Sequence, residues 1–557
     1  MVPTFPLRFA LLVQQAALLL FVTVRCAAMT DEERAAIVRL HNQIRNSVAM
    51  GKEKKWPPAA DMQQMCFFLF RFSFRFPRAR VGGSCEDSAV TRTLLAAFVA
   101  SSWSSAAYSW IRRLSRWSLA PALRRILREA RLYSTKAAAD GGAKSYKLLV
   151  VGGGSGGIAT AAKFASKLGK GQVCVLEPRD AHCYQPLWTL VGGGIKQVSD
   201  SVRPMADVMP RQAEWIQDAA EAFVPQENTV VTKQGIKIKY DFLVVAMGIE
   251  VRFDLVDGLV EGLETPYVCS NYSYDTVTKT YQAMQGLKEG NAIFTYPATP
   301  VKCPGAAQKV MYLTDAHLRK AGRRDKVKIM FNTPLGVLFG VPKYADALWE
   351  VVKERGIAVN LRHELVQVRP ARREAVFRLL DSKDDPKETV TFKYNMLHVT
   401  PPMTAPAALK TGPTFADAAG FLDVDSETLQ HKRYPNVFGI GDCTNVPTSK
   451  TAAAVAGELG ILRKNLTRVM EGKEASNKYN GYTSCPLVTS YSKCILAEFD
   501  SKAEPLETFP FNQAKERRSM FYLKRDMLPF IYWTLFLRGY WEGPSIFRKA
   551  MHLGFSR

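Results

Sequence analysis

The sequence lacks the cysteine patterns that hold disulfide-rich or metal-dependent domains together. Its 557 residues include ten cysteines, but none forms a C-x-x-C pair and no His/Cys cluster has the spacing of a metal site. The cysteine density is far below that of a disulfide scaffold, so we expect no structural metal. Basic residues interleaved with aromatic ones, and zinc-finger spacing, are also missing. We therefore expect no nucleic acid among the partners.

The net charge of +24 is high, and it is unevenly distributed. Residues 1–144 contain 22 Lys and Arg against 9 Asp and Glu, so 13 of the 24 excess positive charges lie in the first quarter of the chain. Anionic lipid or an import signal explains such an excess as well as nucleic acid does. The length allows two or three domains with a large core.

Residues 1–28 have the pattern of a secretory signal peptide, since Arg8 precedes an apolar run that ends in small residues. A membrane anchor is the alternative, although the run is short for a span. Residues 29–87 resemble the opening of the cysteine-rich secretory (CAP) family at 31–34, 41–45 and 56–58. The later histidine, glutamate and disulfide cysteines of that family do not follow. We expect this fragment to be disordered and to come from a misjoined exon.

Residues 88–134 have the profile of a mitochondrial transit peptide. They hold eight arginines, no lysine and one acid, Glu129, and residues 110–131 form a predicted basic amphipathic helix. A basic surface helix is the alternative. The secretory-like start conflicts with a mitochondrial address, and the mass of the mature chain distinguishes the two. A start near Ser134 supports import, and a start near Ala28 supports secretion.

A glycine-rich turn joins a predicted strand to a predicted helix. Residues 146–151 are an apolar run typical of a buried parallel strand, and residues 158–168 have a helical pattern. Between them, Gly152, Gly154 and Gly157 fit G-x-G-x-x-G, which brings a dinucleotide pyrophosphate to the helix N-terminus. Glu177 ends the second predicted strand, 20 residues after Gly157, where a carboxylate suits the adenosine ribose hydroxyls.

Two later segments favour FAD over NAD at this site. Residues 240–248 resemble the strand-and-glycine element that closes an FAD domain, and residues 436–442 resemble the late strand whose aspartate, here Asp442, binds the ribityl chain. The helix that begins at Thr451 can direct its positive end toward the flavin pyrimidine. We therefore predict an α/β fold with an FAD-binding domain formed by residues 145–265 and 395–475.

Residues 266–394 are predicted to form a second Rossmann-like domain that lacks the glycine fingerprint. A strand at 326–331 and a helix at 344–355 are joined by residues 332–340, which place apolar side chains where a pyrophosphate would lie. We expect NADH to bind there poorly or not at all.

Two cysteines, Cys303 and Cys485, lie in the short motifs V-K-C-P-G and T-S-C-P-L. A cysteine pair can hand two electrons to a flavin and can also carry a sulfur atom, so thiol or sulfide redox chemistry is the favoured hypothesis. A small buried hydrophobe is the ordinary alternative for any cysteine. We accept that alternative for Cys174, Cys269 and Cys494, and favour it for Cys183 and Cys443.

From residue 146 onward the sequence resembles the mitochondrial sulfide:quinone oxidoreductases, which are flavoproteins with two dinucleotide-type domains. The resemblance rests on residues 182–188, 299–306, 398–403, 441–445 and 482–488. It implies redox roles for Cys303 and Cys485. It also implies FAD contacts at Ser155, Gly156, Glu177, Gln185, Ala220 (through its backbone) and Asp442.

The resemblance further implies an activity. Sulfide attacks the oxidised cysteine pair, which is bridged by sulfur, and one cysteine becomes a persulfide. Two electrons pass through FAD to ubiquinone, and glutathione or sulfite takes the sulfur. Cys485 is the favoured persulfide side, and the reverse assignment stays open. No cysteine matches the position through which bacterial relatives tether FAD, so we expect non-covalent binding.

Two other functions remain as alternatives. A type II NADH:quinone oxidoreductase would need a second glycine fingerprint and would not need the cysteine pair. A secreted CAP-like binding protein would leave the remainder of the chain inactive.

The C-terminal region, residues 476–557, combines Cys485 with a predicted membrane-binding segment. Residues 520–555 are rich in aromatic side chains interrupted by Lys and Arg, and the apolar run 527–537 is too short to span a bilayer. This pattern favours an amphipathic, monotopic helix pair on the matrix side of the inner membrane. A dimer interface or a core helix is the alternative.

Overall fold

The computed structural model describes residues 144–557, apart from 383–384, 386, 412–413 and 555–557. The predictions for residues 1–28, 29–87 and 88–134 therefore lie outside the described residues.

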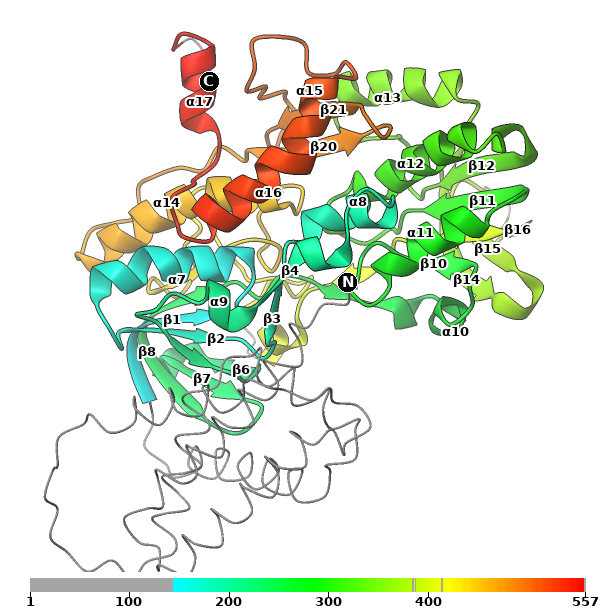
Figure 1. Ribbon diagram of the computed structural model, residues 1–557. Coiled ribbons are helices and arrows are strands. Elements are labelled where there is room, and N and C mark those ends of the chain that lie inside the picture. Colours follow the sequence, from blue (N-terminus) through cyan, green and yellow to red (C-terminus); the bar gives the residue numbers. More distant parts are fainter. Residues whose placement is uncertain (1–143, 383–384, 386, 412–413, 555–557) are drawn as a thin grey trace, which may run out of the picture. The chain divides into compact units, whose positions relative to one another are not determined.

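The first sheet begins with the predicted strand–turn–helix unit (Figure 1). Its strands run in the order β5 (Glu214–Ile216), β2 (Val173–Leu176), β1 (Lys144–Val151), β8 (Lys237–Val245), β7 (Thr229–Thr232) and β6 (Ala220–Val224), and β19 (Val437–Gly439) pairs with the end of β8. β5, β2, β1, β8 and β19 are parallel. Helices α7 (Ser155–Leu168) and α14 (Ala452–Met470) pack against each other beside this sheet. Because both faces are covered, β1 is apolar over most of its length and buried from residue 148 to 151.

The second sheet is entirely parallel, in the order β10 (Val268–Cys269), β17 (Met396–His398), β11 (Gly290–Thr295), β12 (Val327–Asn332) and β13 (Ala358–Asn360). Its helices are α11 (Val277–Gly286), α12 (Ala306–Lys320) and α13 (Pro342–Glu354). An antiparallel sheet of β14 (His363–Arg369), β15 (Glu374–Leu379) and β16 (Thr389–Lys393) adjoins it. Two Rossmann-like domains are thus confirmed.

The structure corrects two details of the second domain. β17 pairs with β10 and β11, so this sheet extends to residue 398, past the boundary predicted at residue 394. The central strand of the sheet is β11, which is followed by α12, whereas the unit predicted from residues 326–355 is the next one, β12 and α13. The loop at the phosphate-binding position is therefore 296–305. It also lacks G-x-G-x-x-G, and it contains Cys303.

Short paired segments join the two domains. β9 (Glu250–Val251) pairs with β18 (Met403–Thr404) where the chain passes between the sheets. The remaining short elements of the two domains are β3 (Ala181–Cys183), η1 (Gln185–Leu187), α8 (Trp188–Gly192), η2 (Val198–Ser201), β4 (Val202–Pro204), α9 (Met205–Val208), η3 (Pro225–Glu227), η4 (Phe253–Leu255), α10 (Leu259–Leu263), η5 (Arg324–Lys326), η6 (Pro370–Arg372) and η7 (Ala407–Thr411).

The C-terminal region consists of a hairpin followed by helices. The hairpin is β20 (Thr483–Val488) with β21 (Cys494–Phe499). α15 (Arg518–Tyr522), η8 (Leu523–Met527), α16 (Leu528–Ile531) and η9 (Tyr532–Phe536) then form one continuous helical stretch, and α17 (Ser545–Met551) follows a turn. Within the part of the chain that the structure describes, each helix is too short or too polar to cross a bilayer.

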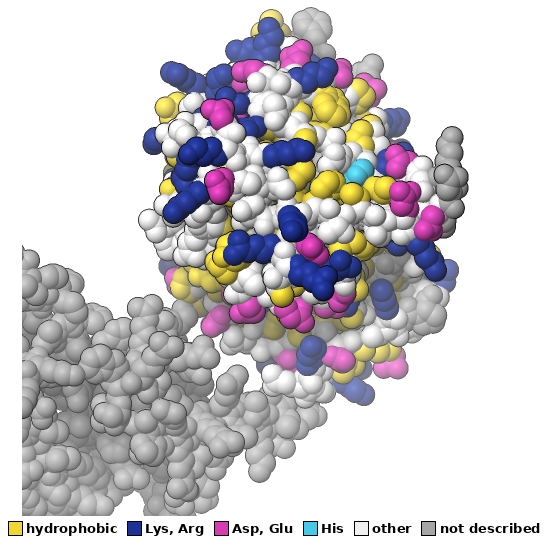
Figure 2. Space-filling model, turned by 90° about the vertical axis from the view of Figure 1, so that its right-hand side faces the viewer, with side chains coloured by type: hydrophobic (Ala, Val, Ile, Leu, Met, Phe, Trp, Pro, Cys, Tyr) yellow, Lys and Arg dark blue, Asp and Glu magenta, His cyan; other side chains and the backbone are white. Residues whose placement is uncertain are grey.

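The surface of the described region carries its basic residues in a dispersed arrangement on the face drawn in Figure 2. There, Lys and Arg side chains are scattered among acidic and uncharged ones. Several cations of the described region have acidic partners, such as Arg378 with Glu364 and Lys432 with Asp423.

Candidate functional site

The glycine turn after β1 is built to approach a ligand closely. Gly152 has a φ of +106°, and a Cβ there would lie 2.7 Å from the carbonyl carbon of Ala246. Gly157 packs equally tightly, since its Cβ would lie 2.9 Å from the carbonyl carbon of Gly152. A Cβ at Gly154 would instead meet nothing within 4 Å, and α7 begins with no side-chain cap and no acid in its first turn. The helix N-terminus is therefore available to an anion.

Glu177 supports this turn from the end of β2. Its Oε2 accepts a hydrogen bond from the backbone N–H of Gly153 at 2.7 Å, and its Oε1 accepts one from the N–H of Arg179 at 2.8 Å. The carboxylate is 9% exposed. It therefore lies directly against the glycine turn, where a ribose that follows the pyrophosphate would be within reach.

Asp442 follows β19 at the same edge of the sheet. Carboxyl ends of neighbouring parallel strands meet at one edge, so the glycine turn after β1, Glu177 after β2 and Asp442 after β19 line up there. Burial raises the pKa of Asp442 above its usual range. The glycine turn has open space in front of it at Gly154 and a carboxylate on either side. This arrangement fits FAD.

The other predicted FAD contacts have different surroundings. Ser155 begins α7, and its hydroxyl lies 2.7 Å from the Tyr532 hydroxyl. A Cβ at Gly156 would lie 3.0 Å from Ile440, which leaves α7 little room for any side chain there. Ala220 is buried at the start of β6, and Gln185 is exposed at the start of η1.

The structure brings the two motif cysteines together although they are 182 residues apart. Cys303 lies in the loop between β11 and α12, and Cys485 lies in β20. Their Sγ atoms are 3.8 Å apart. Cys303 has a φ of +53°, a conformation that costs energy in a residue with a side chain and that is concentrated at functional sites. Its N–H donates to the carbonyl of Lys450 at 2.7 Å, so backbone contacts hold this conformation.

A lysine that sequence reasoning missed lies beside the pair. Lys309, on α12, is 2% exposed, and its Nζ is 3.3 Å from Cys303 Sγ. The hydrogen bond from the Cys485 thiol, together with the Lys309 ammonium, lowers the pKa of Cys303 well below its usual range. The pKa of Cys485 is raised, because its thiol donates a hydrogen bond to Cys303 and because it is buried. The arrangement favours one thiolate, on Cys303.

A second buried lysine comes from the C-terminal helices. Lys524 is 3% exposed and donates to the carbonyl of Pro186 at 2.8 Å. Burial and the nearby Lys309 lower the pKa of Lys524 to about 8, and the sulfur pair partly opposes this shift. Lys524 is one of the cations that interrupt the aromatic side chains of residues 520–555, a pattern that predicts a place at the membrane surface, but in the structure it points inward.

The remaining described cysteines match buried hydrophobes. All seven cysteines in the described ranges are free thiols. Cys174, Cys269 and Cys494 are buried, and burial raises the pKa of each to about 12. Cys443 is also buried, with a pKa raised to about 11, and its Sγ lies 3.5 Å from the carbonyl of Val245. Cys183 is partly buried, with a raised pKa.

A chain of three side chains links the C-terminal helices to the glycine turn. The His182 Nδ1 lies 2.9 Å from the carbonyl of Gly153, which can only accept, so this nitrogen carries the proton. Its Nε2 then accepts from the Tyr532 hydroxyl at 2.7 Å, and Tyr532 accepts from Ser155. Burial lowers the pKa of His182 to about 4, which keeps the ring neutral. His182 and Tyr532 are 350 residues apart, so no local sequence pattern could have predicted this contact.

The C-terminal helices have one buried face and one exposed face. Met520, Phe521, Trp533 and Phe536 pack into the protein core. The exposed apolar side chains are Tyr522, Met527, Phe530, Tyr540, Ile546, Phe547, Met551 and Leu553. This is the two-sided distribution expected of a segment that rests on a second surface.

Comparisons with known proteins place this geometry among named relatives. Residues 146–291 match the pyridine nucleotide-disulphide oxidoreductase family. The chain is 55% identical over 409 residues to the mitochondrial sulfide:quinone oxidoreductase of Mus musculus, covering 73% of this chain and 90% of the relative. The corresponding protein of Dictyostelium discoideum is 46% identical, covering 72% and 87%. The solved sulfide:quinone oxidoreductase of Aquifex aeolicus shares the fold, with a TM-score of 0.62 at 21% identity, over 74% of this chain and 96% of that one.

Proposed function

The chain belongs to the family of mitochondrial sulfide:quinone oxidoreductases, flavin-dependent enzymes that couple sulfide oxidation to quinone reduction, and we propose that Cys303 and Cys485 carry the sulfur chemistry of this reaction. The observation that supports the assignment most directly is the 3.8 Å separation of the two Sγ atoms, with the Lys309 Nζ 3.3 Å from one of them.

The direction of the first step follows from the unequal thiols. We take the oxidised pair as a direct disulfide, without the bridging sulfur that the resemblance implies. Hydrosulfide attacks this disulfide at Cys485 Sγ, a new S–S bond forms, and the bond between the cysteines breaks. The electron pair of that bond stays on Cys303, which leaves as a thiolate. A disulfide opens faster toward the sulfur with the lower pKa, and Cys303 is that sulfur. This supports Cys485 as the persulfide side.

The later steps restore the pair. A sulfite or glutathione nucleophile attacks the outer sulfur of the persulfide, and Cys485 leaves as a thiolate that the Lys309 ammonium can stabilise. The two thiolates then rejoin as a disulfide and give up two electrons. Bound FAD would supply the two-electron acceptor for this step and would pass the electrons on to ubiquinone.

We infer that FAD is held without a covalent bond by the glycine turn, Glu177 and Asp442. The backbone N–H groups at the start of α7 would hold the pyrophosphate, and Glu177 the adenosine ribose. Gly152, Gly154, Ser155, Gly156 and Gly157 belong to this cradle, and Gln185 and Ala220 are proposed to lie along the cofactor. Apart from the sulfur pair, each described cysteine is buried or partly buried with a raised pKa, which fits non-covalent binding.

The membrane side of the reaction is assigned to the C-terminal helices. Ubiquinone is lipid-soluble, so the enzyme must meet the bilayer. The exposed side chains of Phe530 (58%), Ile546 (79%) and Leu553 (84%) suit insertion into one leaflet. The chain is mitochondrial, and we propose that it rests on the matrix face of the inner membrane.

Anaerobic reduction of the bound flavin tests this function. Sulfide should bleach the flavin absorbance of the purified holoenzyme, whereas NADH should not. Cys303→Ser and Cys485→Ser should each abolish bleaching by sulfide while FAD stays bound. The buried Cys494→Ser is the matched control and should bleach like the parent. Bleaching by NADH in both serine variants would instead support a type II NADH:quinone oxidoreductase.

A further inference from the structure

Gly305 lies where the two sulfur-bearing segments touch. It precedes α12 and follows Cys303 by two residues. A Cβ at this position would lie 2.7 Å from Cys485 Sγ and 2.5 Å from Leu487 Cδ2. The backbone here is helical (φ −79°), which any residue adopts without strain. The absence of a side chain at Gly305 therefore allows β20 to approach closely, and the backbone conformation does not require it.

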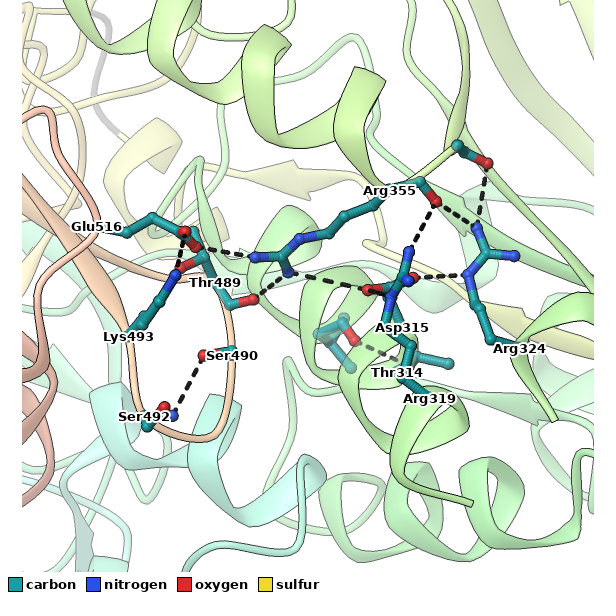
Figure 3. A network of polar contacts seen from close by, with 12 residues as sticks. Thr314, Asp315, Arg319, Arg324, Arg355, Thr489, Ser490, Ser492, Lys493 and Glu516 are labelled. Atoms are coloured by element: carbon teal, nitrogen blue, oxygen red, sulfur yellow. Dashed lines mark hydrogen bonds and ion pairs between the residues drawn. The ribbon is translucent and has the colours of Figure 1, made fainter. Parts of the chain in front are cut away.

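Arg355, which directly follows α13 in the second domain, binds the turn of the β20–β21 hairpin (Figure 3). Its Nη2 donates to Glu516 at 2.8 Å, and its Nη1 donates to the carbonyl of Thr489, the residue that follows β20. Glu516 in turn accepts from Lys493 at 3.1 Å, at the other side of the hairpin turn. One guanidinium thus joins the hairpin turn to the segment that leads into α15.

Asp315 anchors Arg355 to α12. The Asp315 carboxylate is 1% exposed and lies 3.9 Å from Arg355 Nη1. It also accepts from Arg324 at 2.6 Å and from Arg319 at 2.9 Å. Figure 3 shows Arg355 between Asp315 on one side and Glu516 with Thr489 on the other. Arg324 makes its hydrogen bonds within the second domain, where it also donates to the carbonyls of Val327, Arg355 and Gly356.

We propose that the second Rossmann-like domain sets the separation of the sulfurs by docking the β20–β21 hairpin on α12 at two points: Gly305 fixes how closely β20 approaches, and Arg355 fixes the turn. This inference rests on the proposed role of the cysteine pair. Gly305 and Arg355 are positioning residues that act through Cys485. The helix that carries this docking surface, α12, is the same helix that is not preceded by a G-x-G-x-x-G turn.

Gly305→Ala adds one methyl group at a backbone conformation that alanine adopts without strain. The added methyl would start 2.7 Å from the Cys485 sulfur, whereas ordinary contact begins at 3.4 Å, so the two groups must separate by about 0.7 Å. Misplacement of reacting atoms on this scale costs roughly ten- to hundredfold in their effective concentration. Gly286→Ala is the matched control, because Gly286 ends α11 and its Cβ would meet nothing within 4 Å.

Arg355→Met and Arg324→Met form a second matched pair. Both remove a guanidinium from Asp315, and the two side chains are similarly buried, at 11% and 14% exposure. Only Arg355 reaches the hairpin through Thr489 and Glu516. Loosening of the second domain in general should affect both variants, whereas loss of the hairpin docking should affect Arg355→Met alone. Arg355→Lys keeps the charge and should recover part of the effect.

The measurement is the equilibrium between the Cys303–Cys485 disulfide and a glutathione redox buffer, read by alkylation and mass spectrometry on the holoenzyme without sulfide. The pH dependence of Cys303 alkylation is the second readout, because moving Cys485 away should raise the pH at which Cys303 reacts. We expect the effective concentration of the pair to fall about tenfold or more in Gly305→Ala and Arg355→Met. The Gly286→Ala and Arg324→Met controls should stay within about twofold of the parent.

Two results would overturn the proposal: an unchanged equilibrium in Gly305→Ala, or an equal fall in Arg324→Met and Arg355→Met. If Arg355→Met does not fold, the two glycine variants decide alone. Failure of the proposed function would be seen in a different experiment, because the thiol equilibrium is measured without sulfide. It would fail if sulfide still bleached the flavin of the Cys303→Ser and Cys485→Ser variants.

Discussion

Replacing Lys309 with methionine should shift the reactivity of Cys303 to higher pH. The Lys309 Nζ lies 3.3 Å from the Cys303 sulfur. At an effective dielectric constant of about 20, two unit charges at this distance attract by about 5 kcal/mol. The cost of burying the ammonium offsets much of this, and hydrogen bonds to charged groups contribute about 1.5–3 kcal/mol net. Since 1.36 kcal/mol corresponds to one pKa unit, the pKa of Cys303 should rise by about 1–2 units.

The pH range over which the rate falls distinguishes loss of the Lys309 charge from misfolding of the variant. Loss of the cation disfavours the thiolate, so the thiolate-dependent rate should fall about ten- to hundredfold at pH values below the parent's pKa, and by less between the two pKa values. Above both pKa values the rates of the variant and the parent should converge. A variant that is merely misfolded would be slow at every pH.

The assay is anaerobic alkylation of Cys303 over a pH series, followed by stopped-flow reduction of the flavin by sulfide. Lys320→Met is the matched control, because Lys320 is an exposed lysine on the same helix. Coincident pH profiles for Lys309→Met and the parent would refute the assignment of Lys309 as the group that stabilises the Cys303 thiolate.

Two further changes test the C-terminal helices. Tyr532→Phe leaves the His182 Nε2 without its donor, so the free energy of unfolding should fall by about 1–3 kcal/mol in urea titrations. Tyr540→Phe, at a residue 75% exposed, should change it little, and equal stabilities of the two variants would contradict the link. Phe530→Asp should reduce co-sedimentation with anionic lipid vesicles, whereas Val260→Asp on α10 should not. Unchanged co-sedimentation of Phe530→Asp would show that another surface binds the membrane.

The first domain could be predicted from the sequence because its signals are local. The apolar strand, the glycine turn and the helix after it lie within 25 consecutive residues, and each implies the next. Glu177 followed from its fixed spacing after the turn. The strand boundaries differ from the prediction by a few residues only, as for β2 (Val173–Leu176).

Contacts across the chain could not be predicted in this way. β17 has three residues, too few for any periodic pattern, and its membership in the second sheet depends on pairing with β10 and β11. Lys309 had a weak signal, since it follows Cys303 by only six residues. Lys524 and Tyr532 had none, because an inward-pointing lysine or tyrosine in an aromatic, basic segment looks like its membrane-facing neighbours. The inward face of such a helix depends on what it packs against.

The position of Cys303 explains why the second domain keeps its architecture without its glycine motif. In a dinucleotide-binding half, the loop after the first strand leads to a helix whose N-terminus stabilises the pyrophosphate anion. Here the loop between β11 and α12 carries Cys303, and Lys309 lies on the same helix. The same helix end therefore favours a negative charge on sulfur. A thiolate supplied by the chain itself needs no glycine turn, because no phosphate has to approach the backbone. Close approach is required instead at Gly305, whose neighbour is the sulfur of Cys485.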